Sequence, residues 1–134
     1  MEYIKTLDIE SDVEKYIESF GVQLTPDDSF LLSETIEKVR YYIKNRTNQD
    51  EVPEGLKYVW INRSVAGFLT FKLNLNQLNI DGLNFKRIAK EIGEGDTKVV
   101  FENTATTRDK FEVFLMGLQT YGEEEMLKYR RLVW

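Results

Sequence analysis

Apolar side chains recur at helical spacing in the first part of the chain. Between residues 13 and 20 they occupy positions i, i+3, i+4 and i+7, which predicts a short amphipathic helix. Residues 11–14, Ser-Asp-Val-Glu, have the composition of a capping box and predict the start of this helix. Gly21 predicts its end. The apolar positions are Val13, Tyr16, Ile17 and Phe20.

A second helix is predicted to begin after Thr25. Thr25 suits the N-cap and Pro26 suits the first helical position. Asp27 and Asp28 then lie near the positive end of the helix dipole. We expect this helix to end near residues 46–48, before a polar loop. Its apolar stripe consists of Leu32, Ile36, Val39 and Ile43.

The third predicted helix begins at Pro53 and is apolar around most of its circumference. Only a narrow stripe near Arg63 and Thr70 is polar, so we expect this helix to lie at the centre of the fold. Gly67 costs about 1 kcal/mol in a helix interior relative to alanine, and we interpret it as a point of close approach by a neighbouring element. The apolar residues are Val59, Trp60, Ile61, Val65, Ala66, Phe68, Leu69 and Phe71.

The segment that follows lacks a helical period. Residues 74–84 are rich in asparagine and end in Asp81-Gly82, which predicts a connection. Residues 92–101 read Ile-Gly-Glu-Gly-Asp-Thr-Lys-Val-Val-Phe, a turn followed by residues of high strand propensity. We predict a β-hairpin here, and a helix over 84–92 is the alternative. Two strands alone are marginal in water, so the hairpin must lean on the helices or pair with another chain.

The last part of the chain is helical again. A helix is predicted to start at Thr106 or Thr107 and to stop at Gly122, with an apolar stripe at i, i+3, i+4 and i+7. A short final helix follows, because acidic residues 123–125 and basic residues near its end suit the helix dipole. The stripe consists of Phe111, Phe114, Leu115 and Leu118. These elements predict one mainly α domain over 1–134, a small bundle of four to five helices with one β-hairpin.

Composition narrows the possible functions. The chain has 134 residues and a net charge of −5, so it carries no uniformly basic nucleic-acid surface. It contains no cysteine and no histidine, which removes disulfides, thiolate nucleophiles, the usual zinc sites and the commonest general base. The absence of cysteine fits a reducing cytoplasm.

Residues 1–7 do not resemble a secretory signal. The most apolar stretch, 56–73, includes Lys57 and Arg63, which favours a buried helix over a membrane span.

Candidate chemical groups have simpler structural interpretations. Asp27 with Asp28, and the glutamates at 123–125, could act as acid–base pairs or metal ligands, but both groups lie where helix starts favour negative charge. Residues 93–96 contain two glycines without the spacing of a phosphate loop or a calcium loop, so we interpret them as a tight turn. No set of nucleophile and base stands out, and we expect no enzyme activity, cofactor or metal.

The carboxyl end combines large apolar residues with guanidinium groups. Tyr129 and Trp134 lie beyond the last strong helical stripe, and Trp, Tyr and Arg dominate interface energetics. We expect residues 122–134 to form a docking segment, whose docking surface is either the protein's own core or another subunit. The cluster of Lys128, Arg130 and Arg131 could contact nucleic acid, but the net charge favours dipole complementarity and ion pairing.

Three segments together carry a family resemblance. They are Val-Pro-Glu-Gly-Leu at 52–56 before the central helix, Ile-x-Glu-Gly-Asp-Thr-x-Val-x-Phe at 92–101, and the closing Tyr-x-Arg-Arg-Leu-x-Trp region over 129–134. This order resembles the head–tail connector (adaptor) proteins of tailed phages and prophages of Gram-positive bacteria. The resemblance covers residues 25–134, and residues 1–24 carry little of it.

The resemblance implies a structural virion protein, made in the host cytoplasm, that forms a homo-oligomeric ring of typically twelve copies in the neck of the particle. The ring joins the portal to the next neck ring, and DNA passes through its lumen without specific binding; no membrane is involved. The implied portal-facing residues are Tyr129, Arg130, Arg131, Leu132 and Trp134. The implied contacts to a neighbouring subunit or the next ring are Glu94, Gly95, Asp96, Thr97, Val99 and Phe101.

Two other functions compete with the adaptor. A stopper or tail-completion protein of the same neck would be richer in β-structure than this chain. A small helical regulator that binds a partner helix or DNA would need an exposed groove or a basic recognition helix. The predicted second helix offers Lys38, Arg40, Lys44 and Arg46, interrupted by Glu34 and Glu37, which is weak support for the regulator.

Overall fold

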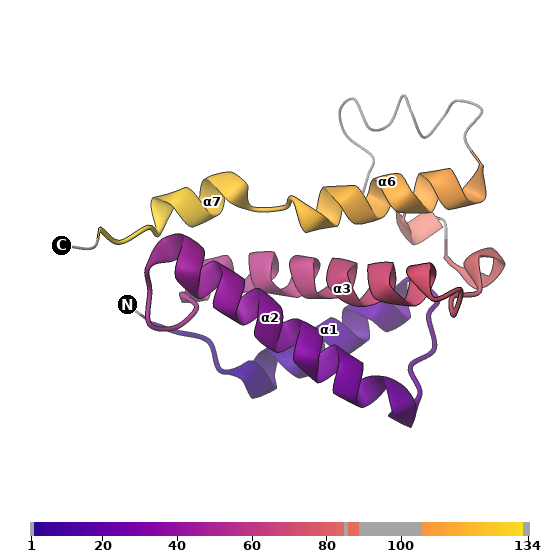
Figure 1. Ribbon diagram of the computed structural model, residues 1–134, viewed down its shortest axis with the longest axis horizontal. Coiled ribbons are helices and arrows are strands. Elements are labelled where there is room, and N and C mark those ends of the chain that lie inside the picture. The colour runs from indigo at the N-terminus through magenta and orange to yellow at the C-terminus, as the bar shows by residue number, and fades with distance from the viewer. Residues whose placement is uncertain (1, 85, 89–105, 133–134) are drawn as a thin grey trace.

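The structure, a computed structural model, describes residues 2–84, 86–88 and 106–132 (Figure 1). In these residues the chain forms α1 (Thr6–Ser19), α2 (Ser29–Thr47), α3 (Lys57–Asn74), α6 (Thr107–Gln119) and α7 (Glu123–Lys128). Short 3₁₀ turns cover Pro26–Asp28, Glu54–Leu56 and Ile80–Gly82. The prediction of a mainly α fold is confirmed. The predicted hairpin at 92–101 lies outside the described residues.

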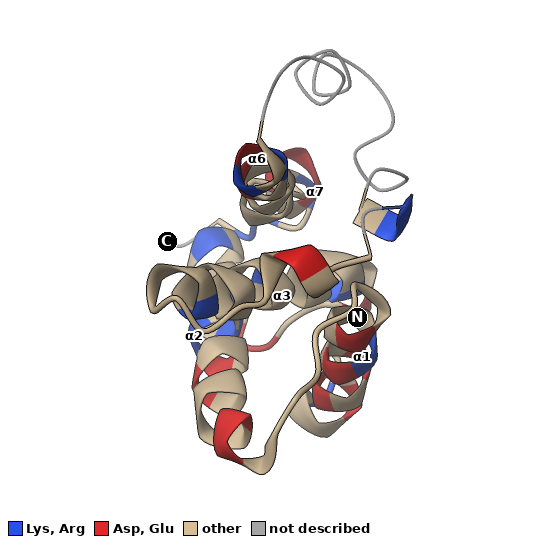
Figure 2. Cartoon of the chain, turned by 90° about the vertical axis from the view of Figure 1, so that its right-hand side faces the viewer, with Lys and Arg blue, Asp and Glu red and all other residues tan. Residues whose placement is uncertain are grey.

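Helix α3 runs through the middle of the molecule (Figures 1 and 2). Helices α1 and α2 pack against one side of it and α6 against the other, while α7 reaches the end of α2. Ten residues of α3 are buried, including Asn62 and Ser64, so its central position is confirmed. The prediction that Phe71 belongs to the apolar circumference is wrong, because its side chain is exposed on the outer face of α3.

The first helix begins earlier than its sequence predicted. Helix α1 starts at Thr6 with Lys5 at the N-cap, so Ser11 and Glu14 lie within the helix instead of capping it. Ile9, four residues before Val13, is fully buried and extends the apolar stripe by one turn. Burial of this extra turn outweighs the local capping preference of Ser11. The end of the helix is as predicted, because Gly21 takes a φ of 92° directly after it.

The start of α2 agrees with its sequence. The Thr25 backbone N–H donates to Asp28 Oδ2 at 3.0 Å, and Pro26 opens the 3₁₀ turn that leads into the helix. The helix ends at Thr47, because Asn48 adopts the left-handed conformation with a φ of 54°. The close approach predicted at Gly67 is also present: a Cβ there would lie 2.9 Å from Thr35 Cγ2 of α2.

Helix α6 has the predicted cap and stripe. Thr106 Oγ1 accepts from the Asp109 N–H at 3.1 Å, and the Thr106 N–H donates to Asp109 Oδ2 at 3.2 Å. Its apolar stripe is buried against α3 and the turn that follows α1, where the rings of Phe20 and Phe114 meet edge to face with centroids 4.8 Å apart.

Two buried polar atoms of α3 have no hydrogen-bond partner among the described residues: Asn62 Oδ1 and Ser64 Oγ. Replacing Ser64 by alanine is therefore expected to raise the free energy of unfolding by about 1 kcal/mol, because an unsatisfied buried hydroxyl is removed. Urea unfolding at an unchanged m-value measures the difference.

Thr47 provides the matched control for this substitution. Its buried hydroxyl donates to the Ile43 carbonyl at 2.7 Å, so Thr47→Val removes a satisfied hydrogen bond and should lower the free energy of unfolding by about 1 kcal/mol. A loss of stability in Ser64→Ala equal to that in Thr47→Val would show that the Ser64 hydroxyl is bonded.

Candidate interaction surface at the carboxyl end

The segment after α7 is tied to the loop that joins α2 and α3. The Arg131 N–H donates to the Thr47 carbonyl at 2.7 Å, and Asn48 Nδ2 donates to the Arg131 carbonyl at 2.9 Å. Gln49 Nε2 donates to the Tyr129 carbonyl at 2.8 Å. Because all three contacts involve backbone groups of residues 129–131, the path of this segment does not depend on its side chains alone.

The same loop also holds the amino end of the chain. The Ile4 N–H donates to the Val52 carbonyl at 3.0 Å, and the Glu54 N–H donates to the Glu2 carbonyl at 2.9 Å. Tyr3 Oη donates to Gln49 Oε1 at 3.3 Å, so Gln49 contacts both ends of the chain. Both termini therefore leave the fold at the same end of the molecule, as Figure 1 shows.

Tyr129 packs on its own protein. Its ring is partly buried against the core, and its hydroxyl lies over Gly55 so closely that a Cβ at Gly55 would overlap it. For Tyr129, the structure thus shows the first of the two docking surfaces that the sequence left open, the protein's own core.

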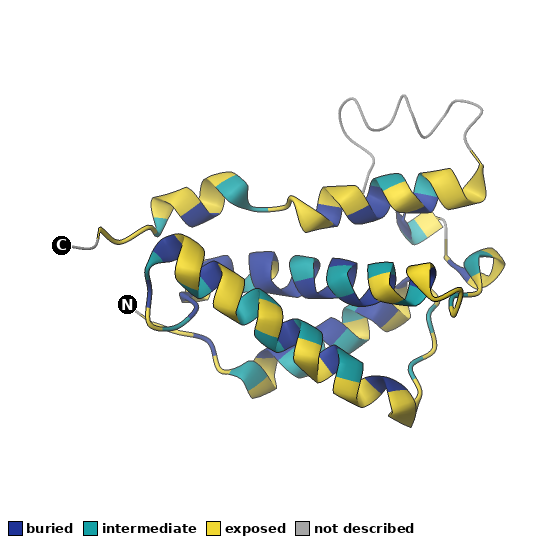
Figure 3. Cartoon of the chain, viewed as in Figure 1, coloured by how far each residue is buried: buried dark blue, intermediate teal, exposed yellow. Residues whose placement is uncertain are grey.

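The residues around Tyr129 face solvent instead. Arg130 is exposed, and Leu132 has 68% of its surface exposed. Figure 3 shows most of the described trace after α7 in the colour of exposed residues. Arg131 Nη2 lies 3.4 Å from Asp50 Oδ1 in an exposed ion pair. Among the predicted portal-facing residues, the structure brings together Tyr129, Arg130, Arg131 and Leu132; Trp134 lies outside the described residues. The six predicted contact residues from Glu94 to Phe101 also lie outside them.

Glu123 anchors the start of α7. Its Oε1 accepts from Arg63 Nη2 at 2.9 Å and from Tyr42 Oη at 3.1 Å, and its Oε2 accepts from Arg46 Nη2 at 3.1 Å. Arg63 Nε donates to the Tyr121 carbonyl at 2.8 Å. This carboxylate joins α2, α3 and α7, so it does more than the predicted capping. Sequence spacing could not reveal the cluster, because its members are up to 81 residues apart.

The hydrogen bonds from Arg63 and Arg46 lower the pKa of Glu123 below its ordinary value of 4.5. A lowered pKa in the folded state means that ionised Glu123 stabilises the fold above pH 4.5, and that this contribution is lost as the pH falls through the lowered value. We therefore expect Glu123→Gln to lower the urea midpoint at neutral pH and to match the parent in acid. Glu124→Gln is the control, since Glu124 has no ion-pair partner among the described residues; a constant difference at all pH values would contradict the assignment.

Asp28 at the start of α2 also connects two helices, in addition to capping the helix start. Its Oδ1 accepts from Lys72 Nζ at 2.7 Å, which links the beginning of α2 to the end of α3. Burial raises the pKa of Asp28, but the hydrogen bonds from Lys72 and Thr25 outweigh burial and the pKa is lowered. The pair is a structural tie between two helices.

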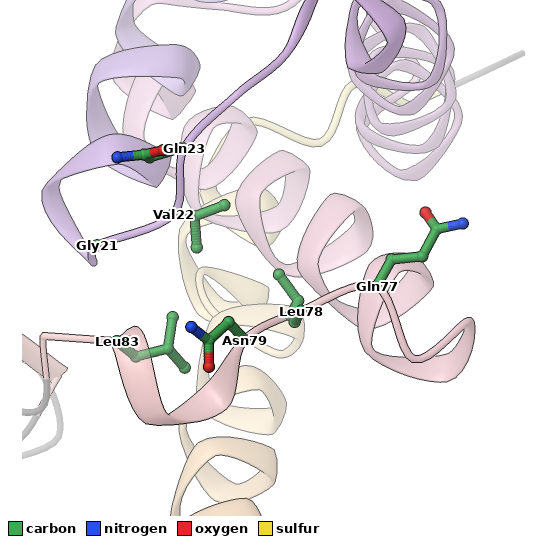
Figure 4. A pocket seen from close by; sticks show the side chains of 8 residues that line it. Gly21, Val22, Gln23, Gln77, Leu78, Asn79 and Leu83 are labelled. Carbon is green, nitrogen blue, oxygen red and sulfur yellow. The ribbon is translucent and has the colours of Figure 1, made fainter.

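A pocket of about 380 Å³ lies between the turn after α1 and the connection after α3 (Figure 4). Its lining consists of glycines, leucines, Val22 and the amide side chains of Gln23, Gln77 and Asn79. It contains no ionisable side chain, and therefore no candidate acid, base or nucleophile. Within the described part of the chain, no group of three or more acidic residues could hold a metal ion. None of the helices that the structure describes is long and apolar enough to cross a bilayer.

The carboxyl strip, residues 129–132, thus has a backbone held by hydrogen bonds and exposed guanidinium and apolar side chains, side-chain types that are common in interfaces. In comparisons with known proteins, no family model, curated protein or solved structure matches the chain.

Proposed function

We propose that the protein is a head–tail connector (adaptor) subunit of a phage or prophage neck, which forms a ring between the portal and the rest of the neck. One observation carries the proposal: the carboxyl strip is hydrogen-bonded to the α2–α3 loop at 2.7–2.9 Å, yet its last described residue, Leu132, is largely exposed. A backbone fixed by hydrogen bonds that presents an exposed apolar side chain is suited to binding an external partner.

The portal is the partner that the sequence resemblance supports. The resemblance includes Tyr129, Arg130, Arg131, Leu132 and Trp134, and in the adaptor family the carboxyl segment engages the portal. Because Tyr129 is used to seat the strip on Gly55, we assign direct contact to Arg130, Leu132 and Trp134. Tyr129 and Arg131 position them.

The charge of the protein supports a passive role toward DNA. The net charge of −5 per copy would make a ring of such copies strongly acidic, and an acidic lumen repels the phosphate backbone, so DNA can pass without sticking. We place residues 92–101 at a contact with a neighbouring subunit or the next ring, as the resemblance implies.

Among the described residues helices predominate and a single isolated β-bridge joins Tyr3 to Pro53. This composition favours the adaptor over a stopper or tail-completion protein, which would be richer in strands. For a regulator that binds through α2, two of the four basic residues are already paired: Arg40 with Glu37 and Glu51, and Arg46 with Glu123.

Co-purification with a phage portal protein tests the proposal. We expect the parent to bind the portal, and deletion of residues 132–134 or Leu132→Ser to abolish or weaken binding while the helical circular-dichroism signal is unchanged. Met116→Ser is the matched control, because Met116 is an equally exposed apolar residue on α6, away from the strip. Full portal binding by the deletion variant would contradict the assignment of the strip, and no binding by the parent would contradict the proposed function.

A further inference from the structure

The outer face of α2 carries exposed aromatic residues. Phe30 has 75% of its surface exposed, Phe71 of α3 is exposed beside it, and Tyr41 is exposed further along α2. Phe30, Leu31, Val39 and Phe71 line a mostly apolar groove of about 520 Å³ that includes Gly67, and Glu34, Thr35 and Lys38 supply its polar lining. Exposed aromatic groups that border a groove are typical of an interaction surface.

The outer face of α1 has a different character. Leu7 is its apolar residue, with 79% of its surface exposed. The other exposed or half-exposed positions along this face are mainly acidic: Asp8, Glu14 and Glu18, with Lys15 as the one base among them. Figure 2 shows α1 and α2 on opposite sides of the molecule below α3.

Charge decides how two copies can approach. Each copy has a net charge of −5, so copies repel one another at long range unless a basic surface is presented. Lys38 and Lys44 on α2 have no ion-pair partner among the described residues, and Lys44 Nζ lies 5.0 Å from the centre of the Tyr41 ring. The acidic outer face of α1 is the surface of a second copy that these lysines attract.

We propose that the outer face of α1 in one copy packs on the outer face of α2 in the next copy, with Leu7 entering the groove between Phe30 and Phe71. Glu14 and Glu18 then lie along Lys38 and Lys44. The inference rests on the proposed function and identifies the contact between neighbouring subunits of the proposed ring. Two different faces on opposite sides of one molecule make a heterologous contact, which builds a ring when the rotation between copies closes.

Pairing α2 with α2 would be the simplest competing arrangement. It would leave Leu7 and the acidic face of α1 without a role. A two-fold contact of this kind also ends at a dimer and cannot continue around a ring.

Disulfide trapping tests the contact, because the natural chain has no cysteine. One mixture contains the Leu7→Cys chain and the Phe71→Cys chain under mild oxidation. The control mixture contains the Leu127→Cys chain and the Phe71→Cys chain, since Leu127 is also an exposed leucine, and the rates of cross-linking are compared. We expect the first pair to cross-link at least about tenfold faster, because binding raises the effective concentration of the two thiols. Trapping detects the contact even where a complete ring requires the portal as a template.

Charge reversal makes the test specific. Adding Lys38→Glu and Lys44→Glu to the Phe71→Cys chain should slow its cross-linking with Leu7→Cys to the rate of the Leu127 pair. Adding Glu14→Lys and Glu18→Lys to the Leu7→Cys chain should then restore the faster cross-linking. Equal rates for the Leu7 and Leu127 pairs, or faster formation of Phe71→Cys homodimers, would overturn the inference. Portal binding by the parent in that case would leave the proposed function in place.

Discussion

Replacing Trp60 by alanine is expected to lower the free energy of unfolding by about 3–5 kcal/mol. Trp60 lies at the middle of the molecule, where α3 packs against α2, and its side chain is 0% exposed. Its Nε1–H donates to the Ile36 carbonyl at 3.0 Å. The substitution removes the largest fully buried side chain of the described residues and also leaves that carbonyl without its indole donor, so the cavity and the lost bond act together.

Because small domains are stable by about 5–15 kcal/mol, this single change should remove a large part of the stability. Urea unfolding followed by circular dichroism measures it. Tyr58→Ala is the control, since Tyr58 is an exposed aromatic residue on the same helix and should cost little. A loss of less than about 1 kcal/mol in Trp60→Ala would mean that α3 is not the centre of the core.

The second large effect is expected at the junction of α6 and α7. Gly122 has a φ of 85°, which is unfavourable for any residue with a Cβ, and an added Cβ would overlap the side chain of buried Val59. We expect Gly122→Ala to cost about 2–4 kcal/mol, the sum of a left-handed backbone penalty and overpacking.

The substitution should also act on the proposed binding surface. Gly122 precedes Glu123, so a shift at this position separates the carboxylate from Arg46 and Arg63 and loosens the strip that follows α7. Limited proteolysis should then cut within residues 122–132, and binding to the portal should fall.

Gly117→Ala is the matched control for this prediction. It is the same substitution five residues earlier, within α6, where an added Cβ would meet nothing within 4 Å. We expect it to stabilise the protein by up to about 1 kcal/mol through helix propensity. Equal effects at the two glycines would contradict the packing of Gly122 on Val59.

Local patterns predicted most of the helices. Thr106 with Asp109, Thr25 with Asp28, and the glycines at 21 and 122 are signals that act within four residues, so the sequence was sufficient to place α6, the start of α2 and the end of α1. The start of α1 was mispredicted because the Ser11 signal is local, whereas burial of Ile9 depends on how α1 packs in the folded molecule.

The candidate site was predictable only in part. The composition of residues 129–132 identified the strip, but its attachment to Thr47, Asn48 and Gln49 joins residues about eighty positions apart in the sequence and leaves no periodic signal. The same holds for the role of Glu123, whose three partners come from α2 and α3. The exposed face of Phe30 was missed because helical spacing identifies the buried side of α2 better than the side that faces solvent.

The most direct test is a structure of the protein assembled on its portal, at a resolution that shows side chains. The account predicts a closed ring coaxial with the portal, in which Leu132 and Trp134 touch the portal and Val99 to Phe101 touch a neighbouring polypeptide. A ring-free complex, or an assembled particle in which Trp134 packs beneath its own helices and Val99 to Phe101 contact no other chain, would contradict it.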